Sequence, residues 1–141
     1  MPDLRRQAVR ALLVSDPGDE ILLVCLFVPD SGKRIWLAPG GGVEVGESNA
    51  AALQREVWEE TGLKIRTPGT PVWRHSHSFV FRQEDIEQHE LYYLLRVPHF
   101  VPHGTNNPAQ NEVELIEDMR WWPLAVSPLT MPSDWSPSVV V

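Results

Sequence analysis

The chain has 141 residues, of which 43% are hydrophobic and 22% charged, an ordinary composition for a globular protein. This length predicts a single domain, residues 1–141, that can bury a sizeable core. The net charge of −7, with twelve scattered basic residues, argues against duplex nucleic acid or a membrane surface as a partner.

Several features bear on the compartment of the protein. No stretch is apolar and long enough to span a membrane, and residues 1–16 lack the apolar region and cleavage site of a secretory signal. The single cysteine, Cys25, rules out an internal disulfide, and its apolar neighbours predict that it is buried and inert. We therefore predict a cytoplasmic protein, or one from an equivalent reducing compartment.

The first part of the chain predicts a hairpin followed by a short strand. Two apolar runs, residues 7–15 and 20–28, flank the turn signal Asp-Pro-Gly-Asp at 16–19 and predict an antiparallel hairpin. Residues 34–38 predict a short strand, and this strand leads directly into the glycine turn at 39–42.

A helix with well-marked ends is predicted after the glycine turn. Ser48 is a typical N-cap residue, and Gly62 stands where a left-handed residue commonly ends a helix. The apolar stripe predicted to face the core consists of Ala50, Leu53, Val57 and Thr61.

Three carboxylates gather on one side of this predicted helix. Glu56, Glu59 and Glu60 stand at positions i, i+3 and i+4, so they project from neighbouring positions. Like charges at this spacing destabilise an isolated helix, and a divalent cation with oxygen ligands is the simplest compensation. Arg55 can also reach a carboxylate, and we expect Glu47 to be its partner. Taken alone, the charge run would fit a solvated face equally well, but the glycine turn and Glu47 favour a metal site.

Residues 41–63 match the signature of the Nudix hydrolases at every defined position. The nine defined positions are Gly41, Glu47, Arg55, Glu56, Val57, Glu59, Glu60, Gly62 and Leu63. The resemblance implies an α+β fold, namely a Nudix-type α/β/α sandwich with a mixed central sheet in a single domain. It also implies hydrolysis of a nucleoside diphosphate linked to another moiety, with Mg²⁺ or Mn²⁺ as the cofactor.

The signature also suggests roles for its residues. Glu56, Glu59 and Glu60 are predicted to bind the metal, and Glu47, Arg55 and Glu56 to belong to the catalytic site. Substrate phosphates are predicted to approach the backbone N–H groups of the three glycines, because no Cβ atom obstructs them. These glycines are Gly40, Gly41 and Gly42.

The second half of the chain predicts three strands with polar connections. Residues 72–81 are predicted to be extended, 82–88 to form a polar turn, and 89–97 to form a strong strand. Residues 98–111 predict a long irregular loop, and 118–122 a last strand. The Pro-rich segment from residue 123 to 141 allows one helical turn near 124–126, and whether the remainder is an arm, an interface or a tail stays open.

The general base is predicted to be a further carboxylate, because a metal-bound carboxylate is a poor base. Glu112 and Glu114 are the favoured candidates, since they follow a long loop that can fold over the pocket. For each of them, a solvated loop position is an equal alternative. Glu117 is a further candidate, and Glu90 is a weaker one for which a strand-surface position is favoured.

Residues that contact the rest of the substrate are harder to predict. Trp121 and Trp122 are adjacent on a strand and must point to opposite faces, so one is predicted to be core and Trp122 is a candidate for stacking on a base. Arg34 is a candidate for binding a phosphate, with a plain surface position as the alternative. Trp58 is expected on the outer part of the helix, packed under a loop or at the contact of a homodimer.

Three functions remain in view from the sequence. The first is a metal-dependent pyrophosphohydrolase acting on a small nucleotide, such as a nucleoside triphosphate or a nucleotide sugar. The second is a catalytically silent Nudix domain that senses nucleotides, and this is disfavoured because all three glutamates and Arg55 are present. The third is removal of pyrophosphate from RNA 5′ ends, and the lack of a basic track counts against it.

Overall fold

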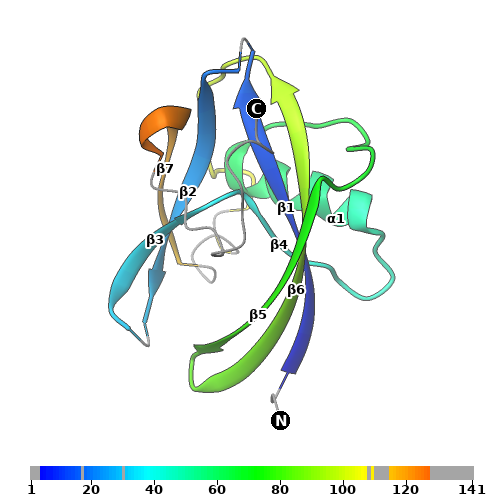
Figure 1. Cartoon of the computed structure of the whole chain (residues 1–141), viewed down its shortest axis with the longest axis vertical. Coiled ribbons are helices and arrows are strands. Elements are labelled where there is room, and N and C mark those ends of the chain that lie inside the picture. Colours follow the sequence, from blue (N-terminus) through cyan, green and yellow to red (C-terminus); the bar gives the residue numbers. More distant parts are fainter. Residues whose placement is uncertain (1–3, 17, 30, 108, 110–114, 128–141) are drawn as a thin grey trace.

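The computed structural model describes residues 4–16, 18–29, 31–107, 109 and 115–127, which form a curled mixed sheet and a helix (Figure 1). In chain order the elements are β1 (Leu4–Ser15), β2 (Glu20–Val28), β3 (Lys33–Leu37), β4 (Gly40–Gly42), α1 (Asn49–Thr61), β5 (Trp73–Phe81), β6 (Glu84–Val97), β7 (Ile116–Pro123) and the 3-10 turn η1 (Leu124–Val126). The mixed sheet within a single domain confirms the predicted fold class. No helix among the described residues is long and apolar enough to cross a membrane.

β1 is the central strand of the sheet. It pairs with β6 in parallel orientation through twelve residue pairs, from Leu4 with Ile86 to Ser15 with Val97. β5 adds to the outer side of β6, and β4 pairs with the other side of β1, both antiparallel. The sheet is therefore built around two strands that are far apart in the sequence.

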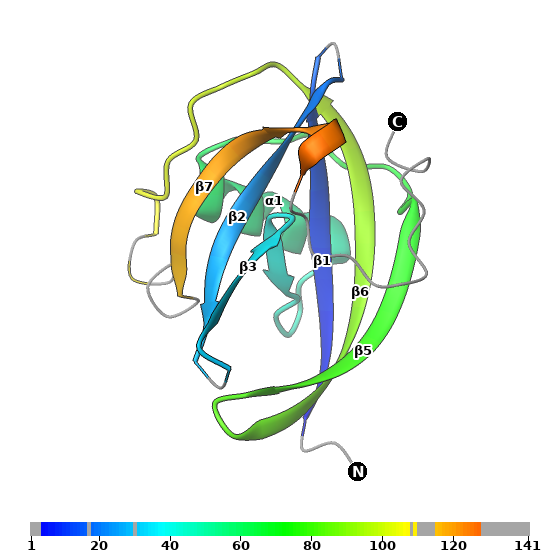
Figure 2. The same cartoon turned by 60° about the vertical axis from the view of Figure 1, so that its left-hand side comes forward.

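The predicted hairpin of β1 and β2 is present, but its two strands separate at once. Their ladder holds the pair Val14–Ile21, after which β2 pairs antiparallel with β3 on one side and β7 on the other. The sheet curls as a result. Figure 2 shows β7, β2 and β3 on one side of β1, and β6 and β5 on the other, with α1 behind.

Side chains alternate along each strand and supply two apolar clusters on the two faces of the sheet. We call the side that packs on α1 the helix face and the other side the opposite face. The helix-face cluster includes Val9, Ala11, Leu13, Leu22, Leu53, Val57 and Tyr93. The opposite-face cluster includes Leu12, Val14, Ile21, Leu23, Ala38 and Tyr92.

α1 forms where the sequence predicts it. The Ser48 hydroxyl accepts a hydrogen bond from the Ala51 N–H at 3.1 Å, and Gly62 ends the helix with φ of +83°. Leu53, Val57 and Thr61 are fully buried, so the predicted stripe does face the sheet, with Ala50 half-buried at its end.

The predicted polar turn at 82–88 is wrong. The turn is limited to Arg82 and Gln83, both with positive φ, and β6 begins at Glu84. The polar residues that follow are part of the strand because the first residues of β1 pair with them, as Leu4 does with Ile86. β7 and η1 confirm the predicted last strand and the single helical turn after it. Residues 128–141 lie outside the described part of the chain.

Candidate active site

The glycine turn lies directly against the acidic side of α1. The Gly40 N–H donates a 2.9 Å hydrogen bond to Glu60 Oε1, and this bond is buried. A Cβ atom at Gly41 would stand only 2.7 Å from Glu56 Oε1, so no other residue type fits at Gly41 without moving the carboxylate. The turn and the helix thus approach more closely than side chains on the turn would allow.

The three glutamates of α1 are buried, which is unusual for carboxylates. Glu56, Glu59 and Glu60 expose 3%, 6% and 2% of their surface. Burying charge is costly unless it is paired or bound to a metal. The cluster therefore needs positive charge beside it.

Arg55 supplies part of that charge and joins the loop to the helix. Its Nε and Nη2 donate to the two oxygens of Glu47 at 2.7 and 2.9 Å, which confirms the predicted pair. Nη2 also donates to the Gly42 carbonyl at 3.0 Å, and Nη1 to Glu56 and Glu59 at 2.9 and 3.3 Å. The hydrogen bond from Arg55 lowers the pKa of Glu47, although burial opposes the shift.

The loop after β6 covers the C-terminal end of α1. The His103 N–H donates to the Thr61 carbonyl at 3.0 Å, and the Asn106 amide to the Trp58 carbonyl at 2.9 Å. Asn107 Nδ2 donates to Glu59 Oε2 at 2.6 Å, so the loop contacts the acidic cluster itself. The long-loop prediction anticipated a segment over the pocket, but nothing in the sequence singled out Asn107.

The donor set suits a hard divalent cation, because Mg²⁺ and Mn²⁺ prefer carboxylate and carbonyl oxygens. Glu56, Glu59 and Glu60 are predicted to bind this cation. Within the described residues, however, no three His, Cys, Asp or Glu side chains are grouped as a metal site. Arg55 donates to Glu56 and Glu59, and the Gly40 N–H donates to Glu60.

The two adjacent tryptophans point to opposite faces, as predicted. Trp121 packs on the helix-face cluster, and its Nε1 donates to the Phe100 carbonyl at 2.8 Å. Trp122 packs on the opposite-face cluster, edge-on to Trp36 with ring centroids 5.1 Å apart. The buried Trp122 Nε1 has no hydrogen-bond partner among the described residues. Stacking of Trp122 on a base stays a prediction.

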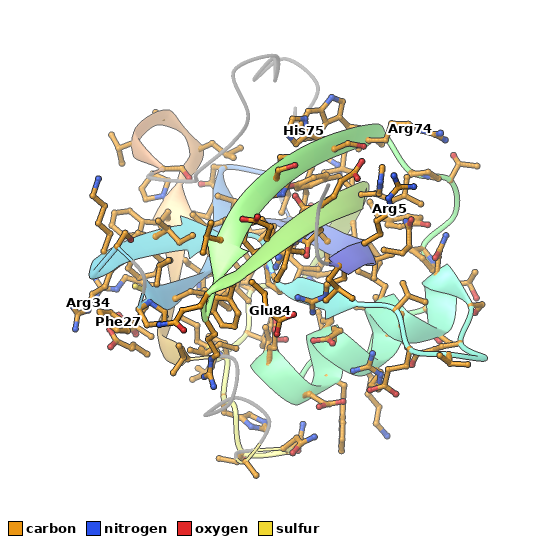
Figure 3. All side chains as sticks on the ribbon, turned by 90° about the horizontal axis from the view of Figure 1, so that it is seen from below. Arg5, Phe27, Arg34, Arg74, His75 and Glu84 are labelled. Carbon is orange, nitrogen blue, oxygen red and sulfur yellow. The ribbon has the colours of Figure 1, made fainter. Side chains whose placement is uncertain are left out.

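Two of the predicted residues, Arg34 and Glu117, are paired with each other. Arg34 pairs with the Glu117 carboxylate and stands over the Phe27 ring, 5.3 Å from its centroid, at the outer end of β3 (Figure 3). Both side chains are exposed, and phosphate binding by Arg34 and a catalytic role for Glu117 stay predictions. Glu112 and Glu114 lie outside the described residues.

Glu90 is buried, with 5% of its surface exposed, so the predicted surface position is wrong. β6 is an inner strand between β1 and β5, and both neighbours bring partners to this carboxylate. Arg10 Nε donates to it at 2.8 Å, and His77 Nε2 lies 2.8 Å from its other oxygen. Burial alone would raise the pKa of Glu90, but the His77 hydrogen bond and the Arg10 charge lower it to about 2. Cys25 is buried as predicted, and burial raises the pKa of its thiol.

Comparison with known proteins supplies the family. A model of the NUDIX domain matches residues 4–137. Diphosphoinositol polyphosphate phosphohydrolase 2 of Rattus norvegicus is 41% identical over 61 residues, which are 43% of this chain and 32% of that protein. RNA pyrophosphohydrolase of Methylococcus capsulatus is 34% identical over 77 residues, 48% of this chain and 40% of that protein. The matched region thus spans less than half the length of either relative.

Solved structures agree over most of the chain. The crystal structure of the MutT NUDIX hydrolase from Burkholderia pseudomallei is similar with a TM-score of 0.66 and 26% identity, covering 89% of this chain and 90% of that one. The MutT protein from Methanosarcina mazei Go1 has a TM-score of 0.62 at 21% identity, covers 92% of this chain and 88% of that one, and supports the fold alone.

Proposed function

The chain belongs to the NUDIX domain family of hydrolases, and from that premise we propose that it is a metal-dependent pyrophosphohydrolase. The proposed substrate is a small nucleotide with a diphosphate linkage, such as a nucleoside triphosphate or a nucleotide sugar. The observation that supports this most strongly is the burial of Glu56, Glu59 and Glu60 against the glycine turn.

The residues of the site have distinct proposed roles. Glu56, Glu59 and Glu60 would hold Mg²⁺ or Mn²⁺, which when bound neutralises phosphate charge and lowers the pKa of a bound water. Arg55 keeps the glycine turn and Glu47 in place beside them, as its hydrogen bonds to Gly42 and Glu47 indicate. The glycines of the turn are proposed to let phosphate oxygens approach the backbone because they carry no Cβ atom, with the Gly40 N–H donating to Glu60.

The general base is proposed to be Glu112 or Glu114. Both come shortly after Asn107 in the sequence, and Asn107 donates to Glu59 of the acidic cluster. A carboxylate that binds no metal keeps the basicity needed to take a proton from water.

A second candidate function is pyrophosphate removal from RNA 5′ ends. It is favoured by the relative named RNA pyrophosphohydrolase. The net charge of −7 weighs against a long track for RNA, because such tracks depend on Lys and Arg. A nucleotide sensor without turnover is disfavoured, since the glutamates and Arg55 are all present. A homodimer and a cytoplasmic location stay predictions.

The test is a comparison of Glu59→Gln with the wild-type protein. Phosphate release is measured against nucleoside triphosphates, nucleotide sugars and 5′-triphosphorylated RNA, with Mg²⁺ or Mn²⁺ and with inorganic pyrophosphatase or phosphatase as the coupling enzyme. We expect Glu59→Gln to abolish turnover and to keep the fold, because the substitution removes one of three crowded like charges. Glu87→Gln on β6 is the control, since Glu87 is a half-buried carboxylate whose ion-pair partners are Arg5 at 3.3 Å and His89 at 3.4 Å. Unchanged turnover in Glu59→Gln would contradict the assignment of the site.

A further inference from the structure

A buried ion pair lies on the opposite face of the sheet, away from α1. Arg10 on β1 and Glu90 on β6 alternate with Val9 and Leu91, which pack on the helix-face cluster. Their side chains are 11% and 6% exposed and are joined at 2.8 Å. The pair is thus separated by the sheet from the helix that carries the acidic cluster.

The Glu90 carboxylate is contacted by side chains from three strands, β1, β5 and β6 itself. Arg10 Nε donates to Oε2 at 2.8 Å, and Gln88 Nε2 donates to the same oxygen at 3.1 Å. His77 on β5 lies 2.8 Å from Oε1, and the Tyr92 hydroxyl donates to Oε1 at 3.4 Å. These contacts fix the carboxylate, and with it the orientation of the Arg10 guanidinium.

Arg10 also reaches the glycine turn. Its Nη1 donates to the carbonyl oxygens of Ala38 and Gly40 at 3.2 and 3.3 Å. Gly40 is therefore held at both of its backbone polar groups, with its carbonyl on Arg10 and its N–H on Glu60 at 2.9 Å. A continuous chain of contacts runs from Glu90 through Arg10 and Gly40 to Glu60.

We propose that Arg10, oriented by Glu90, is a positioning residue that fixes the Gly40 peptide and thereby places the Glu60 carboxylate. The inference rests on the proposed function, in which Glu60 is a metal ligand. Arg10 is suited to this task because its planar fork can donate to a carboxylate through Nε and to carbonyls through Nη1 at the same time. Stability alone is a weak reason for such a residue, since buried ion pairs often stabilise no more than apolar side chains of similar size.

The first variant is Arg10→Lys, which keeps the positive charge beside Glu90 but lacks the fork that also reaches Ala38 and Gly40. Two properties are measured without substrate: the exchange rate of the Gly40 amide proton by NMR, and the Mn²⁺ affinity by titration. We expect faster Gly40 exchange and an affinity for Mn²⁺ about tenfold weaker, as for other residues that orient metal ligands. The melting temperature serves as the measure of overall stability.

The matched control is Arg5→Lys. Arg5 and Glu87 form an ion pair between the same two strands at 3.3 Å, but Arg5 is 72% exposed. This substitution makes the same chemical change in β1 (Arg5 is labelled in Figure 3). It should leave both Gly40 exchange and Mn²⁺ affinity as in the wild-type protein.

The double variant Arg10→Met with Glu90→Gln separates positioning from stability. It removes both charges together, and the new amide can still hydrogen-bond with His77 and Gln88, so the protein should fold even if Arg10→Lys does not. If Arg10 and Glu90 serve only to stabilise the fold, a double variant with the melting temperature of wild-type protein should also have its Mn²⁺ affinity. Positioning predicts that the double variant folds well and still shows fast Gly40 exchange and weak Mn²⁺ binding.

The two readouts distinguish failure of this inference from failure of the proposed function. Suppose that wild-type protein binds Mn²⁺ and that Glu59→Gln weakens this binding. A folded Arg10 variant that binds Mn²⁺ as tightly as wild-type protein, or that shows unchanged Gly40 exchange, then overturns the positioning role but not the proposed function. If wild-type protein binds no Mn²⁺, the proposed function fails, and Gly40 exchange still decides whether Arg10 holds the turn.

Discussion

At the scale of single residues, the acidic cluster is organised by side chains that hold carboxylates in place. Arg55 contacts Glu47, Glu56 and Glu59 at once, and Glu60 accepts the Gly40 N–H. A divalent cation bound among these carboxylates would neutralise negative charge. Groups that orient the carboxylates are then expected to affect turnover more than stability.

Asn107 allows a residue-scale test of this expectation. Its amide donates to Glu59 Oε2 at 2.6 Å, so Asn107→Ala should lower kcat about tenfold, with KM little changed. Steady-state kinetics on the substrate found in the screen would measure both constants. The neighbouring Asn106 donates to the Trp58 carbonyl instead, so Asn106→Ala should leave kcat unchanged. Equal effects of the two substitutions would show that the loop acts as a whole.

At the scale of elements, the C-terminal end of α1 joins the helix to the loop that covers it. Gly62 has φ of +83°, and a Cβ atom there would stand 2.4 Å from His103 Nε2. We expect Gly62→Ala to lower the free energy of unfolding by about 1–2 kcal/mol from backbone strain, plus a further loss from the contact with His103. Urea denaturation of the variant and of wild-type protein gives this difference.

A second substitution separates the two contributions at Gly62. His103→Ala in the Gly62→Ala background removes the side chain that the new methyl group meets. It should restore the part of the loss that comes from the contact and leave the backbone part. If the double variant is no more stable than additivity of the two single changes predicts, the contact contributes nothing.

The elements also show which features are readable from sequence. The contacts within the Nudix signature can be predicted because they are local: Arg55 and its partner Glu47 are eight residues apart. Arg10 and Glu90 are 80 positions apart, and no local sequence pattern predicts that they pair. The start of β6 was placed too late for the same reason, since its polar residues are extended only because they pair with the distant N-terminal part of β1.

At the scale of the whole molecule, the buried Glu90 links stability to pH. The groups that face it are Arg10 from β1, His77 from β5, and Gln88 and Tyr92 from β6 itself. Its pKa is about 2 in the folded protein, below the ordinary value of 4.5. A lowered carboxyl pKa adds stability above the ordinary value, and this contribution is lost as the pH falls from about 4.5 to 2.

Glu90→Gln should therefore be less stable than wild-type protein by roughly 3 kcal/mol at pH 7. The difference should stay constant down to about pH 5 and shrink at lower pH, as wild-type Glu90 becomes protonated. Denaturant unfolding of both proteins at pH 7, 4 and 2.5 measures this. A difference at pH 2.5 as large as at pH 7 would mean that the charge of Glu90 is not what stabilises the fold.

The parallel ladder of β1 and β6 has a consequence for how the chain folds. Leu4 pairs with Ile86, so β1 can form this ladder only after a segment 82 positions later has been synthesised. During synthesis, β1 leaves the ribosome long before β6, and its described ladder with β2 holds a single pair. Sequence-distant pairing slows folding, because the closure of a long loop precedes the contacts that stabilise it. A nascent chain that stops before β6 therefore presents the apolar β1 as an open edge, which is a site for aggregation or for a chaperone to bind.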